Sequence, residues 1–391
     1  MQNINNILCV LPKYSFGSKS RGISPEYNAI FLPLKKKNFK LTFFDSLKHK
    51  NIKKINLNLI KIVENLKPQL VFFAISSYEI YIETLIKIKL ISNPIMINWS
   101  SDDDAWRFDQ HSKILSDYFD CMVTTSREAH KIYKKINRFS ILLSHWGCPD
   151  HWIKKPIRAQ KCKYEVSFVG KSYFDRKELI NYLLNQNINV KCFGYGWNSK
   201  VLKNNELPKV FQNSKISLNF SSTKNSKKQL KARVFEVTGS GGFLITENSP
   251  NLNKFFTKKE ILVFRNKLEL LKCIKKIISN NKLRDNMVKN SSKKSMNYSS
   301  SSIINNILKT VISKKFKKNF FISKKFRKIS KIEIILLKTY KFLSILLLSL
   351  IFDKNKSKKA SRRFLFEIEW RIRKENTYSK NGWCVNLFNI F

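Results

Sequence analysis

Residues 231–246 read Lys231-Ala-Arg-Val-Phe-Glu-Val-Thr-Gly-Ser-Gly-Gly-Phe-Leu-Ile-Thr246, and this stretch decides how the second half of the chain folds. It begins with apolar residues at helical spacing, passes through a glycine-rich turn and ends in a short apolar run typical of a buried strand. A helix, a turn and a buried strand in this order form one step of a parallel sheet that helices cover. We therefore expect an open α/β sheet around this segment.

Charged residues and glycines in the same segment suit a nucleotide. The start of a helix in an open sheet offers amide donors and positive potential to phosphate. Arg233 can bind phosphate oxygens through paired donors, and the carboxylate of Glu236 can accept hydrogen bonds from both hydroxyls of a ribose. Gly241 and Gly242 would let the backbone approach a diphosphate, although glycine pairs before a buried strand also serve only to end helices. The spacing alone leaves both glycine roles open.

The same alternation of short apolar runs and helical segments continues on both sides of this segment. In the second half, strands are expected at residues 165–169, 190–193, 216–220, 243–246 and 261–264, with helices at 176–184, 207–212, 230–238, 268–279, 282–296 and 303–312. In the first half, strands are expected at 7–11, 41–44, 70–75, 95–100, 121–125 and 141–146, with helices at 53–66, 79–91, 109–118 and 127–136. This alternation predicts two doubly wound α/β domains.

The alternation breaks between residues 148 and 163, where two prolines stand among polar and basic residues. We therefore expect an N-terminal domain over 1–147, a linker over 148–163 and a C-terminal domain over 164–312. Residues 313–391 form a basic C-terminal extension with an apolar stretch at 332–352. The charge-free part of that stretch is shorter than the ~20 residues that span a bilayer. The sequence leaves open an amphipathic helix that lies on an anionic membrane and a helical hairpin that packs on the protein.

The chain is strongly basic, with 75 Lys and Arg against 27 Asp and Glu and a formal net charge of +48. Much of this charge accompanies an abundance of Lys, Asn and Ile, which an AT-rich genome produces without selection for a ligand. Seven cysteines are scattered along the chain without the paired spacing of a zinc site, which indicates reduced thiols and a cytoplasmic protein. The N-terminus lacks the basic region and the long apolar stretch of a signal peptide.

The stretch from Lys231 to Thr246 resembles the signature of the CgeB-like branch of glycosyltransferases, which is related to the large group 1 family. In that signature a basic residue, an Arg, a Phe-Glu pair, a Gly-Gly pair and an apolar strand follow one another. The runs Val166-Ser-Phe-Val-Gly-Lys171 and Thr246-Glu-Asn-Ser-Pro-Asn-Leu252 resemble the same family, and the resemblance covers about residues 165–308. It implies the GT-B fold, in which two Rossmann-like doubly wound domains face a cleft.

By this resemblance, Glu236 would bind the ribose of a nucleotide-sugar donor. The residues that would bind the donor diphosphate are Lys231, Arg233, Arg176 and the Gly170-Lys171 loop. The chain departs from the group 1 pattern at Lys228, where many members have a glutamate that contacts the transferred sugar. It also has Met296-Asn-Tyr298 where relatives in this branch tend to have a His-Thr-Tyr element. The resemblance therefore leaves the donor open.

An acidic loop, Asn98-Trp-Ser-Ser-Asp-Asp-Asp-Ala-Trp106, follows a predicted strand of the first domain, where the loops of an open parallel sheet meet ligand. It resembles the Asp-rich loop of the same family and would face the acceptor. The candidate catalytic residues are Asp103, Asp104 and His145, whose neutral imidazole can act as a base. A metal site at Asp102-x-Asp104 is the alternative, but it is typical of single-domain transferases, so no metal is expected.

Together these features predict a metal-independent glycosyltransferase, similar to hexosyltransferases, that moves a sugar from a nucleoside diphosphate donor to a hydroxyl acceptor. We expect that acceptor in an envelope polysaccharide, a glycolipid or a protein, and no cofactor besides the donor substrate. Residues 313–360 would contact an anionic membrane surface, which places the protein in the cytoplasm at the inner membrane face. The alternative is a catalytically inactive basic protein that binds anionic membrane or nucleic acid. No nucleic-acid partner is expected, because the predicted sheets lack interleaved aromatic and basic residues.

Overall fold

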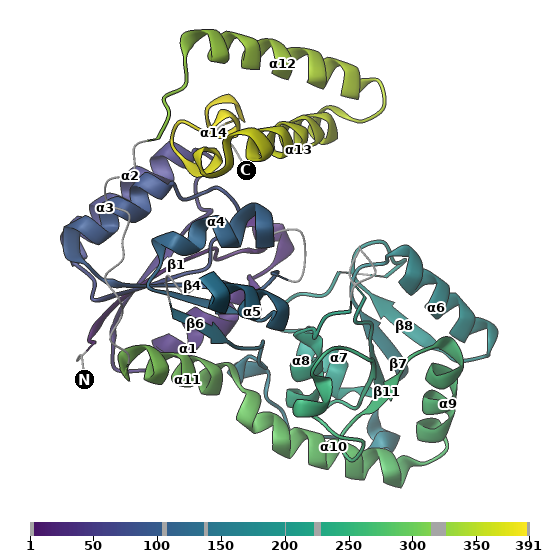
Figure 1. Cartoon of the computed structure of the whole chain (residues 1–391). Coiled ribbons are helices and arrows are strands. Elements are labelled where there is room, and N and C mark those ends of the chain that lie inside the picture. Colours follow the sequence, from purple (N-terminus) through teal and green to yellow (C-terminus); the bar gives the residue numbers. More distant parts are fainter. Residues whose placement is uncertain are drawn as a thin grey trace. The chain divides into compact units, whose positions relative to one another are not determined.

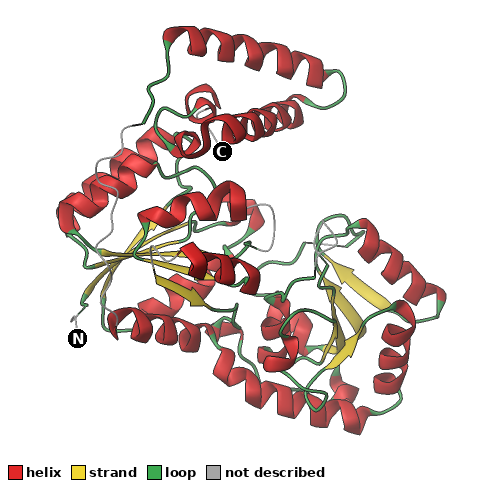
Figure 2. Cartoon of the chain, viewed as in Figure 1, coloured by secondary structure: helices red, strands yellow, loops and turns green. Residues whose placement is uncertain are grey.

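The computed structural model describes residues 4–103, 108–136, 140–199, 201–222, 228–313 and 326–388. The chain divides into two compact units. Unit 1 comprises Met1–Tyr27, Leu34–Ser144 and Lys309–Phe391, and unit 2 comprises Asn28–Pro33 and His145–Leu308. Each unit contains one parallel sheet with helices on its faces (Figures 1 and 2).

The sheet of unit 1 has six strands in the order β2-β1-β3-β4-β5-β6, and every pairing is parallel. The strands are β1 (Asn6–Leu11), β2 (Lys40–Asp45), β3 (Leu70–Phe73), β4 (Ile95–Ser100), β5 (Cys121–Thr124) and β6 (Ser140–Leu143). The helices among them are α1 (Leu32–Lys35), α2 (Ile52–Leu66), α3 (Ile82–Ser92), α4 (Lys113–Leu115) and α5 (Arg127–Ile136).

The central strands of unit 1 are apolar because helices cover both faces of the sheet. Every residue of β3 is buried, and so is every residue of β1 after Asn6. Helix α2 presents Ile55, Leu59 and Val63 to this core at helical spacing. Its first turn is capped by Asn51, whose side chain accepts a hydrogen bond from the backbone N–H of Lys54 at 3.1 Å. Burial of each such apolar side chain stabilises the fold by about 1.5–3 kcal/mol.

The sheet of unit 2 has five parallel strands in the order β11-β10-β9-β7-β8. The strands are β7 (Tyr164–Val169), β8 (Val190–Phe193), β9 (Ser214–Asn219), β10 (Leu244–Glu247) and β11 (Leu262–Phe264). The helices are α6 (Phe174–Asn185), α7 (Leu207–Gln212), α8 (Arg233–Gly239), α9 (Lys267–Ile278) and α10 (Asn281–Ser295). Helix α11 (Ser300–Ser313) follows them.

The predicted fold class is confirmed: both halves form parallel sheets flanked by helices, and a helical region follows. Each expected strand has a counterpart whose ends lie within three residues of the expected ones. A helical segment at the π-helical turn Tyr27–Phe31 and α1 was not predicted from the sequence. Pro33 is the second residue of α1 and so lies in a first turn, where a helix tolerates proline.

Residues 148–163, expected to be a linker, run along unit 2 and are held by a buried arginine. Arg284 is fully buried, and its guanidinium donates to the carbonyl oxygens of Ile157 at 2.7 Å, Ser214 at 3.0 Å and Lys215 at 3.1 Å. Because a buried guanidinium needs its donors satisfied, these bonds join the segment to β9 and α10.

The C-terminal extension folds as three helices, α12 (Lys331–Ser349), α13 (Lys354–Arg373) and α14 (Trp383–Phe388). Helix α13 and the turn after it pack on unit 1. The Tyr378 hydroxyl donates to the carbonyl oxygen of Gln110, and the Ser379 hydroxyl donates to Glu83 at 2.5 Å. Glu369 joins α13 to α14 by accepting the backbone N–H groups of Trp383 at 2.5 Å and Cys384 at 2.8 Å. This part of the extension is therefore a fixed piece of unit 1.

Helix α12 differs from α13 because much of its apolar surface faces solvent. Leu337 is its one buried residue, whereas Phe342, Leu347 and the following Leu350 are exposed by 68%, 63% and 81%. Within the part of the chain that the structure describes, no helix is both long enough and apolar enough to cross a bilayer. Helices α12, α13 and α14 pack on one another, as the hairpin alternative predicts, while α12 keeps an uncovered apolar face. Whether that face lies on a membrane stays a prediction.

Candidate functional site

The topology of unit 2 places a reversal of chain direction at the carboxyl ends of β7 and β9. Strand β7 pairs with β8 on one side and β9 on the other, so the chain leaves β7 in one direction and returns on the opposite side. The loops after two such strands diverge, and ligands of open α/β sheets bind in the gap between them. The Gly170-Lys171 loop follows β7, and Ser221 and Ser222 follow β9.

Arg233 and Glu236 lie at this edge because α8 begins there and runs back toward the start of β10. Nη1 of Arg233 lies 2.5 Å from Oε2 of Glu236, and the two side chains remain 21% and 16% exposed. The guanidinium also lies 4.8 Å from the ring centre of Phe211, which fixes its plane. Both groups are therefore oriented at the edge of the sheet, and neither is sealed in the core.

Arg176 lies near the same edge, at the start of α6. Its Nη1 donates to the carbonyl oxygen of Lys171 at 3.1 Å, and its guanidinium lies 4.8 Å from the ring centre of Tyr173. Burial lowers the pKa of Arg176, and the charges of Arg233 and Glu247 act on it in opposite directions. These groups are thus within electrostatic range of one another. Its Nε is buried and has no acceptor among the described residues, so it can donate to a bound anion.

Glu247, the last residue of β10, organises the loop after β9. Its Oε2 accepts the backbone N–H groups of Ser221 at 2.8 Å and Ser222 at 3.2 Å, and its Oε1 accepts from Nζ of Lys228. Burial alone would raise the pKa of Glu247, but these hydrogen bonds outweigh burial and lower the pKa overall. Sequence reasoning missed this residue, although an acid at the end of a buried strand is the signal that could have found it.

Lys231 belongs to the loop that leads into α8. Its Nζ donates to Oε1 of Gln229 at 2.5 Å, which holds the ammonium beside the loop. Lys231 stands two residues before α8 in the chain. Of the predicted donor-site residues, the structure pairs Arg233 with Glu236 and joins Arg176 to the Gly170-Lys171 loop by a hydrogen bond, and Arg176 lies within electrostatic range of Arg233.

The glycine turn lies at the opposite edge of the sheet. Gly241 and Gly242 follow the last turn of α8 and precede β10, and both are buried. Gly241 has a φ of +72°, and a Cβ atom there would lie 2.9 Å from the carbonyl oxygen of Lys154. A Cβ atom on Gly242 would lie 2.6 Å from the carbonyl oxygen of Phe211. These glycines permit close backbone packing at the end of a helix, and we leave them out of the donor site.

In the acidic loop of unit 1, the carboxylate of Asp103 is used in hydrogen bonds within the protein. Asp103 is buried, and its two oxygens accept hydrogen bonds from the hydroxyls of Ser100 at 2.5 Å and Thr124 at 2.6 Å. These bonds tie the loop to β4 and β5. Asp104 lies outside the described residues. In the ranges that are described, no group of three His, Cys, Asp or Glu side chains is arranged to hold a metal ion.

His145 lies in a cluster of aromatic rings in unit 2. Its ring centre lies 4.9 Å from that of Phe235, 4.7 Å from that of Phe255 and 5.5 Å from that of Tyr298. Nδ1 contacts the carbonyl oxygen of Trp146 at 2.8 Å. Burial lowers the pKa of His145 and outweighs the opposing effect of this hydrogen bond, so the imidazole is neutral at neutral pH. Its surroundings favour a packing role over the predicted role as a base.

Comparisons with known proteins agree with this architecture. Residues 176–309 match the protein family described as glycosyl transferase-like. HepE from Anabaena, solved in complex with UDP and glucose, has a TM-score of 0.57 at 8% sequence identity, over 79% of this chain and 100% of that chain. The chain has the GT-B fold. The family match spans α6, α8 and β10, and together with the GT-B fold it supports a glycosyltransferase.

Two further GT-B structures show the same likeness. A glycosyltransferase from Rickettsia africae ESF-5 has a TM-score of 0.54 at 12% identity, over 80% of this chain and 100% of that chain. The BGT protein of phage T4, solved in complex with its UDP-glucose substrate, has a TM-score of 0.52 at 11% identity, over 79% of this chain and 100% of that chain. No curated protein sequence matches this chain.

Proposed function

We propose that this chain transfers a sugar from a nucleoside diphosphate donor to a hydroxyl acceptor, and that the donor binds at the carboxyl edge of the unit 2 sheet. The observation that carries the proposal is the Arg233–Glu236 pair at the start of α8, 2.5 Å apart and partly exposed where the loops after β7 and β9 diverge. The family match over residues 176–309 includes this pair, and the similar HepE and T4 BGT structures hold UDP or UDP-glucose.

Each group at this edge has a role in the proposal. Glu236 accepts hydrogen bonds from the ribose hydroxyls, because a carboxylate offers two oxygens at the right spacing for a diol. Arg233 and Lys231 bind the diphosphate, and the buried Nε of Arg176 supplies a further donor. Glu247 and Lys228 hold the Ser221-Ser222 turn in place beneath the transferred sugar.

In this mechanism the basic residues act mainly on the leaving group. As the bond between the sugar and the diphosphate breaks, negative charge gathers on the diphosphate oxygens. Arg233, Lys231 and Arg176 carry the compensating charge, so they stabilise the transition state more than the bound donor. We propose that these three basic side chains make a bound metal dispensable, as the predicted metal-independent reaction requires.

A thermal-shift panel of UDP-, GDP-, ADP- and dTDP-sugars tests the proposal. A ligand that binds only the folded state stabilises it by about 2.7 kcal/mol at a hundred times its Kd, so one nucleotide class should raise the Tm by several degrees. Calorimetry on Glu236→Ala should show this binding abolished. Lys276→Ala, which changes an exposed residue near the end of α9, should bind as the unaltered chain does. Unchanged binding by Glu236→Ala would refute the donor site.

We further propose that α12 lies on an anionic membrane surface, as expected for residues 313–360, and that the acceptor is presented there. The uncovered apolar residues of α12, among them Phe342, Leu346 and Leu347, would enter the headgroup region. Lys338 and Lys354 line an open groove beside these residues and would face lipid phosphates, whereas Nζ of Lys341 in the same groove donates to the carbonyl oxygen of Leu387 at 2.9 Å. Each basic residue near an anionic surface adds about 1 kcal/mol of attraction.

Sedimentation with vesicles tests this surface. Vesicles that contain phosphatidylserine should bind the unaltered chain, and Phe342→Glu with Leu346→Glu should weaken that binding at least tenfold, because two charges would enter the headgroup region. Lys48→Gln with Lys50→Gln, on a loop of unit 1, changes the net charge by the same two units and serves as the control. Equal binding by both double variants would mean that α12 is not the contact surface.

A further inference from the structure

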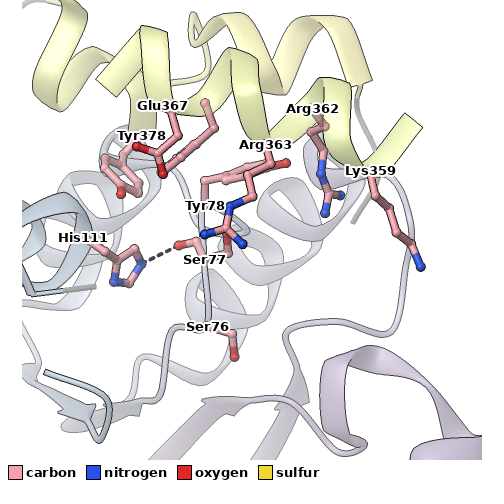
Figure 3. Close-up of a pocket in the computed structure, with 10 residues that line it drawn as sticks. Ser76, Ser77, Tyr78, His111, Lys359, Arg362, Arg363, Glu367 and Tyr378 are labelled. Carbon is pink, nitrogen blue, oxygen red and sulfur yellow. Dashed lines mark hydrogen bonds between the residues drawn. The ribbon is translucent and has the colours of Figure 1, made fainter. Parts of the chain in front are cut away.

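A pocket of about 280 Å³ lies in unit 1 between the loop after β3 and helix α13 of the C-terminal extension. Ser76, Ser77 and Tyr78 line it from the loop, and Lys359, Arg362 and Arg363 line it from α13. Figure 3 shows the guanidinium groups of Arg362 and Arg363 pointing from the helix toward this loop. The pocket thus brings together, within one unit, residues that lie almost three hundred positions apart in the chain.

The pocket lies beside the carboxyl end of β3, one of the two strands at which the sheet of unit 1 reverses. Strand β1 pairs with β2 on one side and β3 on the other, so the chain reverses its direction across the sheet at this point. The Ser76-Ser77 loop leaves the carboxyl end of β3 beside that reversal. Ligands of such sheets bind outside the carboxyl ends of the strands at this reversal.

The charge of the pocket favours an anion. Among the described residues that line it, three are basic and Glu367 is the one acid. The Glu367 carboxylate is already engaged, since it lies 2.8 Å from Nε2 of Gln110 and 3.0 Å from Nη1 of Arg371. Arg362 also acts electrostatically on Tyr78, whose pKa is raised by burial and lowered by this guanidinium. The carboxylates of Glu79 and Glu369 act on Tyr78 in the opposite direction, but neither lines the pocket, so the charge of the lining itself is mainly cationic.

The floor of the pocket is preformed and offers hydroxyl groups. The backbone N–H groups of Ser76 and Ser77 donate to the buried carboxylate of Glu79 at 2.5 and 2.6 Å, which fixes the turn. These amides are consequently occupied, so the charged donors that line the pocket are those of Lys359, Arg362 and Arg363. One wall is aromatic, because the ring of Tyr78 stacks on Phe366 at 5.8 Å. An aromatic wall beside hydroxyl donors suits a sugar ring or a prenyl-like chain next to an anionic group.

We propose that this pocket binds the phosphate group of a phosphorylated acceptor. Two adjacent arginines and a lysine suit the several charged oxygens of a phosphate monoester or a diphosphate better than a single carboxylate. The inference rests on the proposed function for the identity of the ligand as an acceptor. The phosphate belongs to a lipid headgroup or to a soluble sugar phosphate, and the pocket chemistry is the same for both.

Calorimetry with inorganic pyrophosphate tests the pocket independently of the reaction, in the presence of saturating UDP so that the unit 2 edge is occupied. Arg362→Gln with Arg363→Gln should weaken pyrophosphate binding at least tenfold. Lys356→Gln with Lys358→Gln removes the same charge from exposed positions on α13 outside the pocket and should stay within twofold of the unaltered chain. Equal pyrophosphate binding by the two double variants would overturn the proposal.

A second variant guards against misfolding of the first. Lys359→Glu reverses a charge on the exposed rim and should also weaken pyrophosphate binding at least tenfold, with UDP binding retained as a sign of correct folding. If UDP fails to bind any form of the chain, the proposed donor site falls, whereas the pyrophosphate comparison without UDP still decides the pocket. Unchanged pyrophosphate binding by Lys359→Glu would count against the pocket even if the arginine variant loses it.

Two ligands distinguish a lipid phosphate from the phosphate of a soluble acceptor. If it belongs to a lipid, the arginine variant should bind vesicles of phosphatidic acid at least fivefold more weakly than the Lys356→Gln, Lys358→Gln control does. If it belongs to a soluble acceptor, glucose 1-phosphate should bind more tightly than inorganic phosphate, and the arginine variant should lose that preference. Failure of both comparisons would overturn the proposal of a phosphorylated acceptor.

Discussion

Each sheet of this protein has, at its carboxyl edge, a Ser-Ser turn whose backbone N–H groups are held by a glutamate. The two edges differ in which part of the chain supplies the basic residues near that turn. In unit 1, Ser76 and Ser77 donate their backbone N–H groups to Glu79. In unit 2, Ser221 and Ser222 donate theirs to Glu247. In each unit a carboxylate fixes a Ser-Ser turn after a strand beside the point where the chain reverses across the sheet.

The two turns differ in where their glutamate and the nearby basic residues come from in the chain. Glu79 comes from the loop itself and is fully buried, and the basic groups near it belong to α13, almost three hundred residues along the chain. Glu247 comes from the neighbouring strand and is paired with Lys228, and the basic groups near it belong to the same βαβ step, apart from Arg176 at the start of α6. A site built within one step of the sheet can be predicted from sequence, whereas a site completed by a distant helix cannot.

The largest effect is expected at the unit 2 edge. Arg233→Ala combined with Glu236→Ala removes charge-assisted hydrogen bonds worth about 1.5–3 kcal/mol each, so kcat/KM for the donor should fall about a thousandfold. The measurement is initial-rate kinetics with the nucleotide-sugar that the thermal-shift panel identifies. Lys276→Ala provides the control for loss of a positive charge in unit 2. A loss below tenfold in the double variant would place the donor elsewhere.

The two glutamates should differ in their contribution to stability. Glu79→Gln replaces an acceptor of two N–H groups with one that also carries a donor, at a fully buried position, and should lower the free energy of unfolding of unit 1 by about 3 kcal/mol. Glu247→Gln should cost about 1 kcal/mol, because Lys228 is 44% exposed and water can solvate its charge. Hydrogen exchange of the two Ser-Ser turns measures both effects. Equal losses would show that the carboxylates play the same structural part.

The helix that completes the unit 1 pocket should respond to pH. Burial raises the pKa of Glu369 to about 7, because this cost exceeds the stabilisation by its two backbone donors and by Arg373. A carboxyl whose pKa is raised on folding contributes stability that is present below its unfolded value of about 4.5 and is lost as the pH rises to about 7. Protection of α14 from exchange should therefore fall by about 2 kcal/mol between pH 5 and pH 7. Glu369→Gln should abolish this slope, and a slope that persists in that variant would assign it to another group.

The smallest effect is expected at His145, which lies in an aromatic cluster of unit 2. Phenylalanine preserves the ring in the cluster of Phe235, Phe255 and Tyr298, so His145→Phe should change kcat/KM less than twofold. A general base contributes about a hundredfold or more, and the pH profile of the rate would change with its loss. A hundredfold loss in His145→Phe, with a normal Tm, would restore the predicted role as a base and add a catalytic group outside the two edges.

The comparison also shows how far sequence reasoning reached into the site. The helix that carries Arg233 and Glu236 was predicted from its spacing, and so was the strand that follows. The sequence analysis assigned Gly241 and Gly242 to the ligand. The composition of a glycine-rich turn does not tell at which edge of the sheet the turn lies, so this assignment could not be tested from the sequence. The direction of α8 decides the edge, and it places these glycines against the backbone at Lys154 and Phe211.

The amino-acid sequence by itself determined the alternation of strands and helices, the two parallel sheets, and the position of an arginine and a glutamate three residues apart on one helix. These features depend on neighbours within a few residues, and apolar periodicity records them directly. Only the tertiary structure decided that Glu247 takes the Ser221-Ser222 turn and Lys228 as partners, that Arg284 holds the 148–163 segment, and that Arg362 and Arg363 face the Ser76-Ser77 loop. These contacts join residues far apart in the chain, and no local pattern encodes which distant surfaces meet when the core is buried.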